Sequence, residues 1–367
     1  MIWVKILLAT LLGNRLHALR LAVIDGGISH CISLNPNKAT LASLARTLVP
    51  QVERSILFEG LDSLIFQCEF ILLFKFRMTN FAPSLSLGEI IEILPSLAAQ
   101  HARTSATYDA LDHRARAAVA ASGLIRETVE AIPLGSFGPI VFPFVRMGAI
   151  TTLELFGLDE LIIFSFYWAN RHRYRSAADI GANLGLHSIL MGKCGWNVIA
   201  YEPDPVHAKL LRSNLDLNGS GGVEAIEAAV SDKPGTLEFV RVLGNTTSSH
   251  LAGAKNDAYG KLERFPVKTE SIASIMPSVD FIKMDAEGQE KVIVLGTNAQ
   301  HWVDTDMIVE VGSEENAAAI YEHLRKIGVR AFAQKLGWRK VESLDDMPSN
   351  YKNGSLFITR KPAMLWA

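Results

Sequence analysis

The chain has 367 residues, which is enough for two domains or for one large domain with an extension. Its 36 Lys and Arg residues nearly balance 38 Asp and Glu residues, so the net charge of −2 gives no basis for bulk attraction to nucleic acid. The three cysteines are far apart in the sequence, and the histidines show no metal-binding spacing. This composition indicates a reducing, cytoplasmic compartment and argues against a disulfide framework or a structural metal.

The first 77 residues give the weakest pattern in the chain. Two apolar runs, Met1 to Gly13 and Leu64 to Phe76, fit neither a signal peptide nor a membrane-spanning helix, so no stable membrane insertion is expected. No helical or strand period continues through this segment. We therefore hypothesise that Met78 is the natural start and that residues 1–77 are an extension; the alternative is a genuine helical N-terminal domain.

Residues 78–134 are predicted to form a helical N-terminal region. Ala-rich segments with interspersed Arg and Glu predict helices over 87–99 and 109–130. Residues 135–146, with Pro139 and Pro143, are typical of a hairpin or an edge strand.

Between residues 158 and 327 helical and strand patterns alternate, after which an antiparallel pair is predicted at 329–335 and 355–359. Such alternation predicts an α/β fold with a mostly parallel sheet, helices on both faces and a ligand at the carboxyl ends of the strands. The predicted strands are 176–180, 197–202, 223–230, 236–242, 265–269, 280–285 and 307–311, and the predicted helices are 158–168, 186–194, 204–218, 290–296 and 316–327.

A glycine-containing turn follows the first of these strands. The strand ends at Asp179, Gly181 and Gly185 follow, and the next strand ends at Glu202, which is 202 − 181 = 21 residues after the first glycine. That spacing matches the roughly 20 residues by which a nucleotide-binding βαβ unit places a carboxylate on ribose hydroxyls. Because Asp179 would repel a pyrophosphate, the turn favours a cationic ligand over a dinucleotide.

Further acids follow other predicted strands, namely Asp232, Asp285 and Glu310. A single acid in this position is commonly a helix N-cap. Together with Asp179 and Glu202, however, they make five acids along one edge of one sheet, and this predicts a site.

Four motifs, in this order, resemble the FkbM-type methyltransferases. They are Asp179 to Gly185, Tyr201 to Pro205, Ala229 to Asp232 and Lys283 to Gly288. The resemblance covers about residues 138–360. It implies a Rossmann-like class I methyltransferase fold, α/β, with a seven-stranded, mostly parallel sheet and an antiparallel closing strand, plus a mainly helical N-terminal extension. For the glycine turn alone, a generic nucleotide-binding turn is the alternative.

The resemblance assigns residues 135–367 to a methyltransferase domain that uses S-adenosyl-L-methionine. Glu202 is expected to accept both ribose hydroxyls, and Asp179 to take the methionine amino group directly or through water. The other cofactor contacts are expected from the glycine turn, where Gly181 and Gly185 allow close backbone approach, and from the ends of the next strands: Gly181, Asn183, Gly185, Asp204 and Ala229.

Asp285 is the expected catalytic residue, with Glu287 in support. A carboxylate at this strand end can orient an acceptor hydroxyl and take its proton. The alternatives are that Asp285 is the N-cap of the helix from Glu290, and that Glu287 only complements that helix through its charge. Glu160, on the helix before the turn, is a further candidate for the cofactor end of the site.

The function expected from the resemblance is O-methylation of a hydroxyl on a sugar, a glycan or a small natural product. The alternatives are a non-catalytic binding module with the same fold, and a methyltransferase for a nucleic-acid or amine acceptor. Acceptor choice is expected to reside in the N-terminal third, and the oligomeric state is left open. The polar, Gly-containing segment from Gly244 to Gly260 is predicted to be a mobile lid over the acceptor; the alternative is a plain surface loop.

Overall fold

The computed structural model divides the chain into two compact units, Met1–Phe81 and Ala82–Ala367. Met78 lies outside the described residues, so a natural start there stays a prediction. The described residues are 3–11, 16–25, 28–34, 85–124, 130–254, 260–364 and 366.

The first unit contains a three-stranded antiparallel sheet made of β1 (Trp3–Leu11), β2 (Leu16–Asp25) and β3 (Ile28–Leu34). These strands do not fit the alternative of a helical N-terminal domain in residues 1–77, where no strand was predicted. The segments have seven to ten residues and are separated by short breaks, a length that suits strands better than helices.

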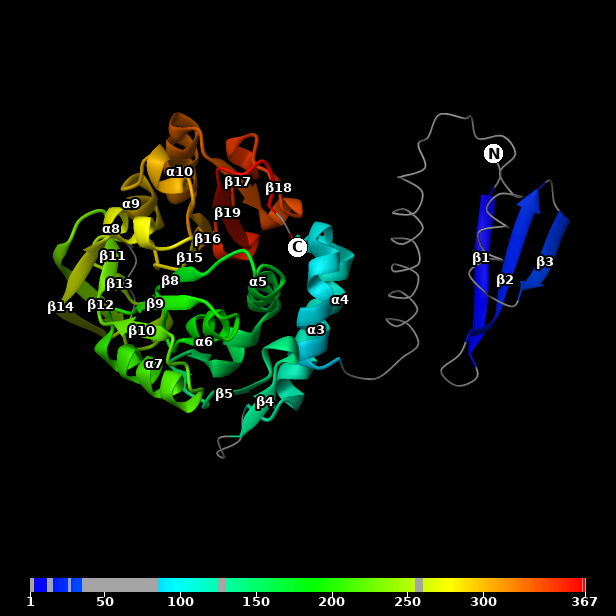
Figure 1. Ribbon diagram of the computed structural model, residues 1–367, viewed down its shortest axis with the longest axis horizontal. Helices are drawn as coiled ribbons and strands as arrows, with labels where there is room; N and C mark the ends of the chain where they lie inside the picture. The colour runs from blue at the N-terminus through cyan, green and yellow to red at the C-terminus, as the bar shows by residue number, and fades with distance from the viewer. Residues whose placement is uncertain are drawn as a thin grey trace. The chain divides into compact units, whose positions relative to one another are not determined.

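The second unit is built on an eight-stranded sheet with the order β10-β9-β8-β15-β16-β19-β17-β18 (Figure 1). In this order the strands β10, β9, β8, β15 and β16 are parallel to one another, and β19 is antiparallel to both of its neighbours. Successive strands run one way from β8 and the other way from β15, so the order reverses between these two. The strands are β8 (Ser176–Ile180), β9 (Asn197–Tyr201), β10 (Val223–Ile226), β15 (Phe281–Met284), β16 (Asp306–Glu310), β17 (Arg330–Ala333), β18 (Arg339–Lys340) and β19 (Ser355–Thr359).

The mostly parallel sheet and its antiparallel strand agree with the expected architecture, but the expected count of seven strands is exceeded by β18. This two-residue strand pairs with β17. The chain reverses between them at Gly337, whose φ of 64° lies in the left-handed region that glycine tolerates best.

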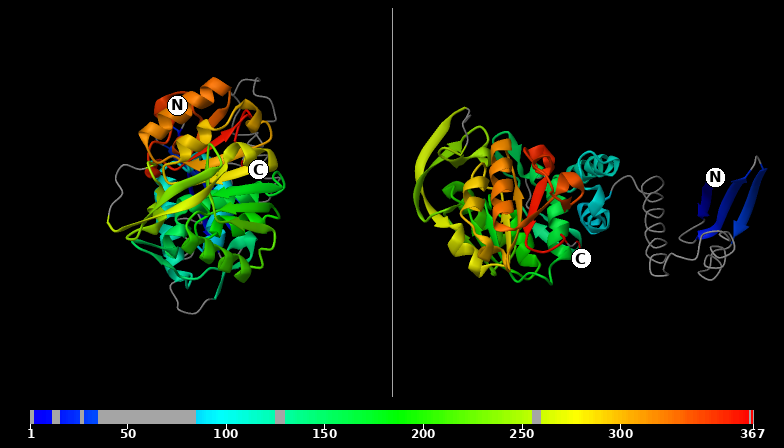
Figure 2. Two further views of the ribbon diagram at one scale, coloured as in Figure 1. Left: turned by 90° about the vertical axis from the view of Figure 1, so that its left-hand side faces the viewer. Right: turned by 90° about the horizontal axis from the view of Figure 1, so that it is seen from above.

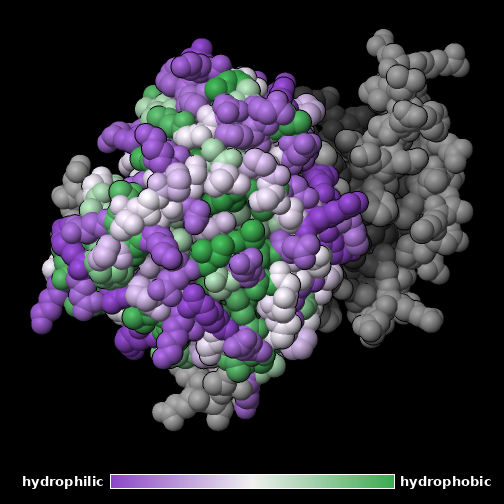
Figure 3. Space-filling view, turned by 60° about the vertical axis from the view of Figure 1, so that its left-hand side comes forward, coloured by the Kyte–Doolittle hydropathy of each residue, from purple (hydrophilic) through white to green (hydrophobic). Residues whose placement is uncertain are grey.

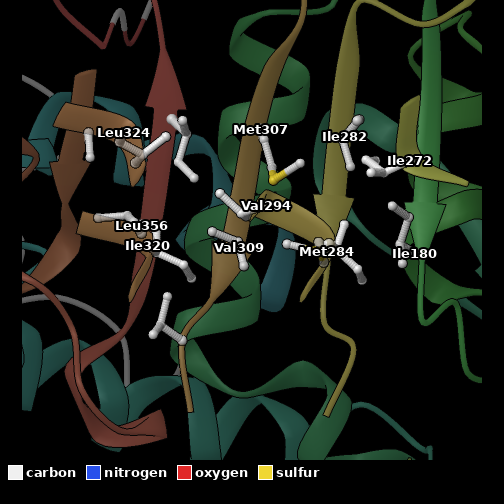
Figure 4. Packing of buried hydrophobic residues seen from close by; sticks show 14 of the residues in the cluster. Ile180, Ile272, Ile282, Met284, Val294, Met307, Val309, Ile320, Leu324 and Leu356 are labelled. Carbon is white, nitrogen blue, oxygen red and sulfur yellow. The ribbon is translucent and has the colours of Figure 1, made fainter. Parts of the chain in front are cut away.

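Helices cover both faces of the sheet (Figures 1 and 2). On one face lie α5 (Leu158–Ala169), α6 (Leu186–Lys193) and α7 (Pro205–Leu217), and on the other α8 (Ile272–Ile275), α9 (Glu290–Leu295) and α10 (Glu314–Ile327). Because side chains alternate along a strand, Ile282 and Met284 enter the apolar core beneath α9 and α10 (Figure 4), whereas Phe281 packs its ring against Phe166 of α5.

A second, four-stranded sheet has the order β11-β14-β12-β13. It corrects the prediction of one strand over 223–230: the chain leaves the strand at residues 227 and 228, so that β10 and β11 are separate. The two parts pair in different sheets, so β11 places Ala229 next to the ends of the main strands. The strands are β11 (Ala229–Ser231), β12 (Gly235–Val242), β13 (His250–Leu251) and β14 (Leu262–Ser271).

The helical region expected at 78–134 is found as α3 (Leu87–Ile93), η1 (Leu94–Gln100) and α4 (Ala106–Ala121). These elements pack against α5 within the second unit. The expected helix at 109–130 ends at Ala121, and residues 125–129 lie outside the described part of the chain. A short antiparallel pair, β4 (Ala131–Pro133) and β5 (Pro139–Val141), follows.

The surface in Figure 3 mixes hydrophilic and apolar residues, with the apolar ones gathered near the middle of that face. Among the described residues, no helix is long and apolar enough to cross a membrane.

Candidate active site

A cavity of about 310 Å³ lies at the carboxyl ends of β8, β9, β15 and β16. The beginning of β11 and the segment after β12 complete its wall. The lining residues used below are Glu160, Gly181, Asn183, Glu202, Asp204, His207, Ala229, Thr246, Asp285, Glu287 and Glu310. The cavity thus collects side chains from the region where the strand order reverses, as the alternating pattern predicts.

A glycine is required at position 181 because the chain after β8 lies in close contact with the chain after β15. The φ of Gly181 is +75°, and a Cβ there would lie 1.8 Å from the carbonyl oxygen of Asp285. Gly185, with a φ of +85°, faces Leu211 of α7, whose Cδ1 would be 2.2 Å from a Cβ. The protein's own packing therefore requires both glycines, and their expected role in ligand approach stays a prediction.

Glu202 is held at the wall of the cavity by two backbone N–H groups. The N–H of Asn183 donates to Oε2 and the N–H of Asp204 donates to Oε1, both at 2.8 Å. The side chain is 6% exposed, and this burial raises the pKa of Glu202 to about 8 despite the two hydrogen bonds. Each carboxylate oxygen keeps a second lone pair that can accept a hydroxyl.

Asp204 has a structural role, and its position in the sequence indicates only part of that role. Its carboxylate caps α7 by accepting the N–H of Val206 at 2.8 Å. It also makes a bidentate pair with Arg241 of β12, at 2.6 and 2.7 Å. Although burial opposes it, the Arg241 guanidinium lowers the pKa of Asp204. Because its carboxylate is already engaged in these contacts, Asp204 forms part of the cavity wall and holds that wall in place.

Asp179 lies beneath the cavity and does not line it. Its register partner on β15 is Lys283, so the two side chains share the face of the sheet that α5 and α6 cover. Ser188 of α6 donates to Oδ2 at 2.5 Å, and the Lys283 Nζ atom lies 3.8 Å from Oδ1. The side chain is fully buried. Direct contact with a bound ligand, one form of the sequence prediction, does not fit this position.

Asp285 and Glu287 reach the cavity from the turn after β15. The N-cap of α9 is Gln289, so the alternative that Asp285 caps this helix is wrong. Glu287 has a φ of +49°, uncommon for a residue with a side chain, and Gly288 follows at +102°. The backbone therefore turns sharply here and keeps both carboxylates at the cavity.

Two further acids, Glu160 and Glu310, line the same cavity. Burial raises the pKa of Glu310 well above its usual value, and the neighbouring Asp285 carboxylate adds to the effect. Glu160 is different, because the Nε2 atom of His187 lies 3.0 Å from its carboxylate. This contact lowers the pKa of Glu160 although burial opposes it. His187 is in turn 2.8 Å from the hydroxyl of Tyr167.

The segment predicted to be a lid contributes part of the wall. The Thr246 hydroxyl lies 2.9 Å from the Nε2 atom of His207 on α7. The Gly244 carbonyl accepts the N–H of Ala149 at 2.9 Å. Residues 255–259 lie outside the described chain, so closure of this segment stays a prediction.

The structure brings most of the predicted site residues to one cavity: Gly181, Asn183, Glu202, Asp204, Ala229, Asp285 and Glu287. Gly185, Asp179 and Asp232 are not part of its lining. The sequence did not indicate roles for Lys283, His187, His207 and Arg241, whose contacts depend on pairing between distant strands and helices.

A mostly parallel sheet with antiparallel β19, a glycine turn after β8 and an acid after β9 is the arrangement expected of the class I methyltransferase fold. Residues 179–331 match the model of the family described as the methyltransferase FkbM domain. This match confirms the resemblance that the four motifs carry.

One similar protein is methyltransferase sdnD of Sordaria araneosa, 28% identical over 159 residues, with 34% of this chain and 61% of that protein covered. The chain thus matches less than two thirds of that relative's length. A solved S-adenosylmethionine-dependent methyltransferase from Agrobacterium tumefaciens is 9% identical, with 65% of this chain and 72% of that chain covered and a TM-score of 0.35. An O-methyltransferase from Bacillus cereus, solved in complex with SAH, is 13% identical with 53% and 78% covered and a TM-score of 0.28. Structural similarity at these TM-scores supports no argument, and the fold is assigned from the strand order alone.

The contact between Gly181 and Asp285 yields a stability prediction. Gly181→Ala should lower the free energy of unfolding by about 3 kcal/mol, because a left-handed backbone and a close steric contact act together. Gly195→Ala is the matched control, since Gly195 has a φ of +86° and no atom within 4 Å of a Cβ. Its cost should be about 1 kcal/mol. Equal losses for both variants in denaturant unfolding would contradict the contact.

Proposed function

We propose that this protein is an S-adenosyl-L-methionine-dependent O-methyltransferase acting on a hydroxyl of a sugar, a glycan or a small natural product. The observation that carries the proposal is Glu202, a buried carboxylate held by two backbone N–H groups at the end of β9. Its free lone pairs face a cavity bounded by the glycine turn, where ribose hydroxyls can donate to them.

The described residues fit this cofactor. Glu202 would hold the ribose, and the carbon-rich wall of Ala229 and Phe239 would lie along the adenine. The Oδ1 atom of Asn183 is buried and has no hydrogen-bond partner among the described residues, so it is available to a polar group of the ligand. When bound, S-adenosylmethionine supplies an electrophilic methyl group, and the protein has to orient the acceptor and receive its proton.

Asp285 is proposed as the residue that receives this proton. A hydroxyl within hydrogen-bond reach of its carboxylate donates to Oδ1 or Oδ2 and transfers the proton as the new C–O bond forms. Glu287, which is two residues further along the same turn, is proposed to orient the same hydroxyl. No cluster of His, Cys, Asp or Glu suited to a metal ion is found in the described part of the chain.

Cofactor binding should depend on pH through Glu202. Since its pKa in the free protein is about 8 and ribose binds to the carboxylate form, binding releases a proton below that pH. The affinity for S-adenosylhomocysteine should therefore rise from roughly pH 6 to roughly pH 8 and then level off. Calorimetry in two buffers of different ionisation enthalpy measures both the affinity and the released proton.

Glu202→Gln should weaken binding about tenfold or more and remove most of this pH dependence. A Gln side chain cannot accept both backbone N–H bonds, because one of its two terminal atoms is a donor. Glu224→Gln, at an exposed position on β10, is the control and should keep the wild-type profile. A wild-type affinity that does not change with pH would exclude the ribose role of Glu202.

Asp285→Asn tests the catalytic assignment. Asn keeps the size and hydrogen-bonding shape of the side chain but cannot take a proton, so methyl transfer should fall by about 10²- to 10⁴-fold. The melting temperature and the affinity for S-adenosylhomocysteine should stay at the wild-type values. Asp232→Asn, at a strand end outside the cavity, is the control for removing an acid. Near-normal transfer by the Asp285 variant would make this residue structural.

A further inference from the structure

A second cavity, of about 510 Å³, adjoins the first. Helix α4 forms one wall, and η3 (Thr152–Phe156) with the first turn of α5 forms another. The segment from Tyr351 to Ser355, where β19 begins, closes the third side. Its walls therefore come from the helical N-terminal region, from η3 and α5, and from the segment that leads into β19.

Three glutamates, Glu154, Glu160 and Glu310, line both cavities. Glu310 follows Val309, which is the register partner of Met284, and the residue after Met284 is Asp285. Glu310 and Asp285 are therefore neighbours across two parallel strands. A molecule held in the second cavity lies beside the carboxylates of the proposed reacting centre.

The charges of the second cavity exclude one class of ligand. The lining contains two cations, Arg103 and Arg116, and each is paired: Arg103 with Asp159, and Arg116 with Asp112 at 2.8 Å. Asp159 also accepts from the Nε2 atom of Gln334 at 2.6 Å. A phosphate or carboxylate entering here would meet more acids than unpaired cations, and like charges at short range repel.

The N-terminus of α5 does not restore an anion site. Asp159 and Glu160 occupy its first turn and already complement the helix dipole. Hydroxyl groups suit this wall, because carboxylates are acceptors and the raised pKa of Glu310 lets its protonated form donate as well.

The lining also contains apolar side chains. Phe156 and Leu158 are buried at the cavity, and the Tyr351 side chain, 62% exposed, lies at its edge. A lining that combines acids with apolar side chains matches a ring that carries hydroxyls on its edge and C–H groups on its face.

We propose that this second cavity binds the methyl acceptor, and that the acceptor is an uncharged molecule with several hydroxyls and no phosphate or carboxylate near the reacting one. The proposal rests on the proposed function. Glu160 and Glu310 then position the acceptor, and α4 limits its size.

Ala120 offers a test of the location. It is exposed on α4 and lines the second cavity, so Ala120→Trp fills the cavity with little effect on folding. Ala117 is exposed on the same helix but is not part of the lining, and Ala117→Trp is the matched control. The probes are methyl glycosides, each paired with a phosphorylated sugar or a nucleotide sugar. Transfer of a labelled methyl group from S-adenosylmethionine is measured together with calorimetric binding of S-adenosylhomocysteine.

The full-length protein should methylate neutral probes and spare their phosphorylated partners. Ala120→Trp should lower this transfer by about a hundredfold while binding S-adenosylhomocysteine normally, and Ala117→Trp should behave as wild type. Equal transfer by both variants would place the acceptor elsewhere. Preference for the phosphorylated probes, or transfer to no neutral probe, would overturn the acceptor class. Failure of the wild type to bind S-adenosylhomocysteine would instead contradict the proposed function.

Discussion

The backbone contact between Gly181 and Asp285 sets the geometry on which the rest of the site depends. A hydrogen bond of 2.9 Å from the Asp285 N–H to the Ile180 carbonyl continues the pairing of β8 and β15 to their last residues. The chain can then turn at Gly181 only because no Cβ meets the Asp285 carbonyl. The turn after β8 leads to Asn183, whose N–H donates to Glu202, and the turn after β15 leads to Glu287. One close approach therefore positions both the proposed ribose acceptor and the proposed proton acceptor.

The charged side chains that are buried below the cavity complement this geometry. Asp179 and Lys283 are buried side by side on the covered face of the sheet, while Glu202, Asp285 and Glu310 end the strands above. Burial lowers the pKa of a lysine, but here the surrounding carboxylates, led by Asp179, raise the pKa of Lys283. A charged Lys283 offsets part of the repulsion among the acids, which allows several of them to gather at one sheet edge.

Much of the fold could be predicted from the sequence, because periodicity is strong from Ser176 to Ile327. The acid after β9 was found by its spacing from the glycine turn. The role of Asp179 was not, since only the register of β8 against β15 shows that it faces Lys283. The break between β10 and β11 was also missed. Its residues continue an apolar pattern, and only pairing in two different sheets separates them. The second cavity depends on the packing of α4, which no local pattern encodes.

A crystal structure of the protein with S-adenosylhomocysteine would test the account most directly. Both ribose hydroxyls are expected within hydrogen-bond distance of the Glu202 carboxylate, with the sulfur directed toward Asp285 and the adenine beside Ala229. Ligand density elsewhere on the protein, or a ribose that does not contact Glu202, would contradict the assignment of this cavity.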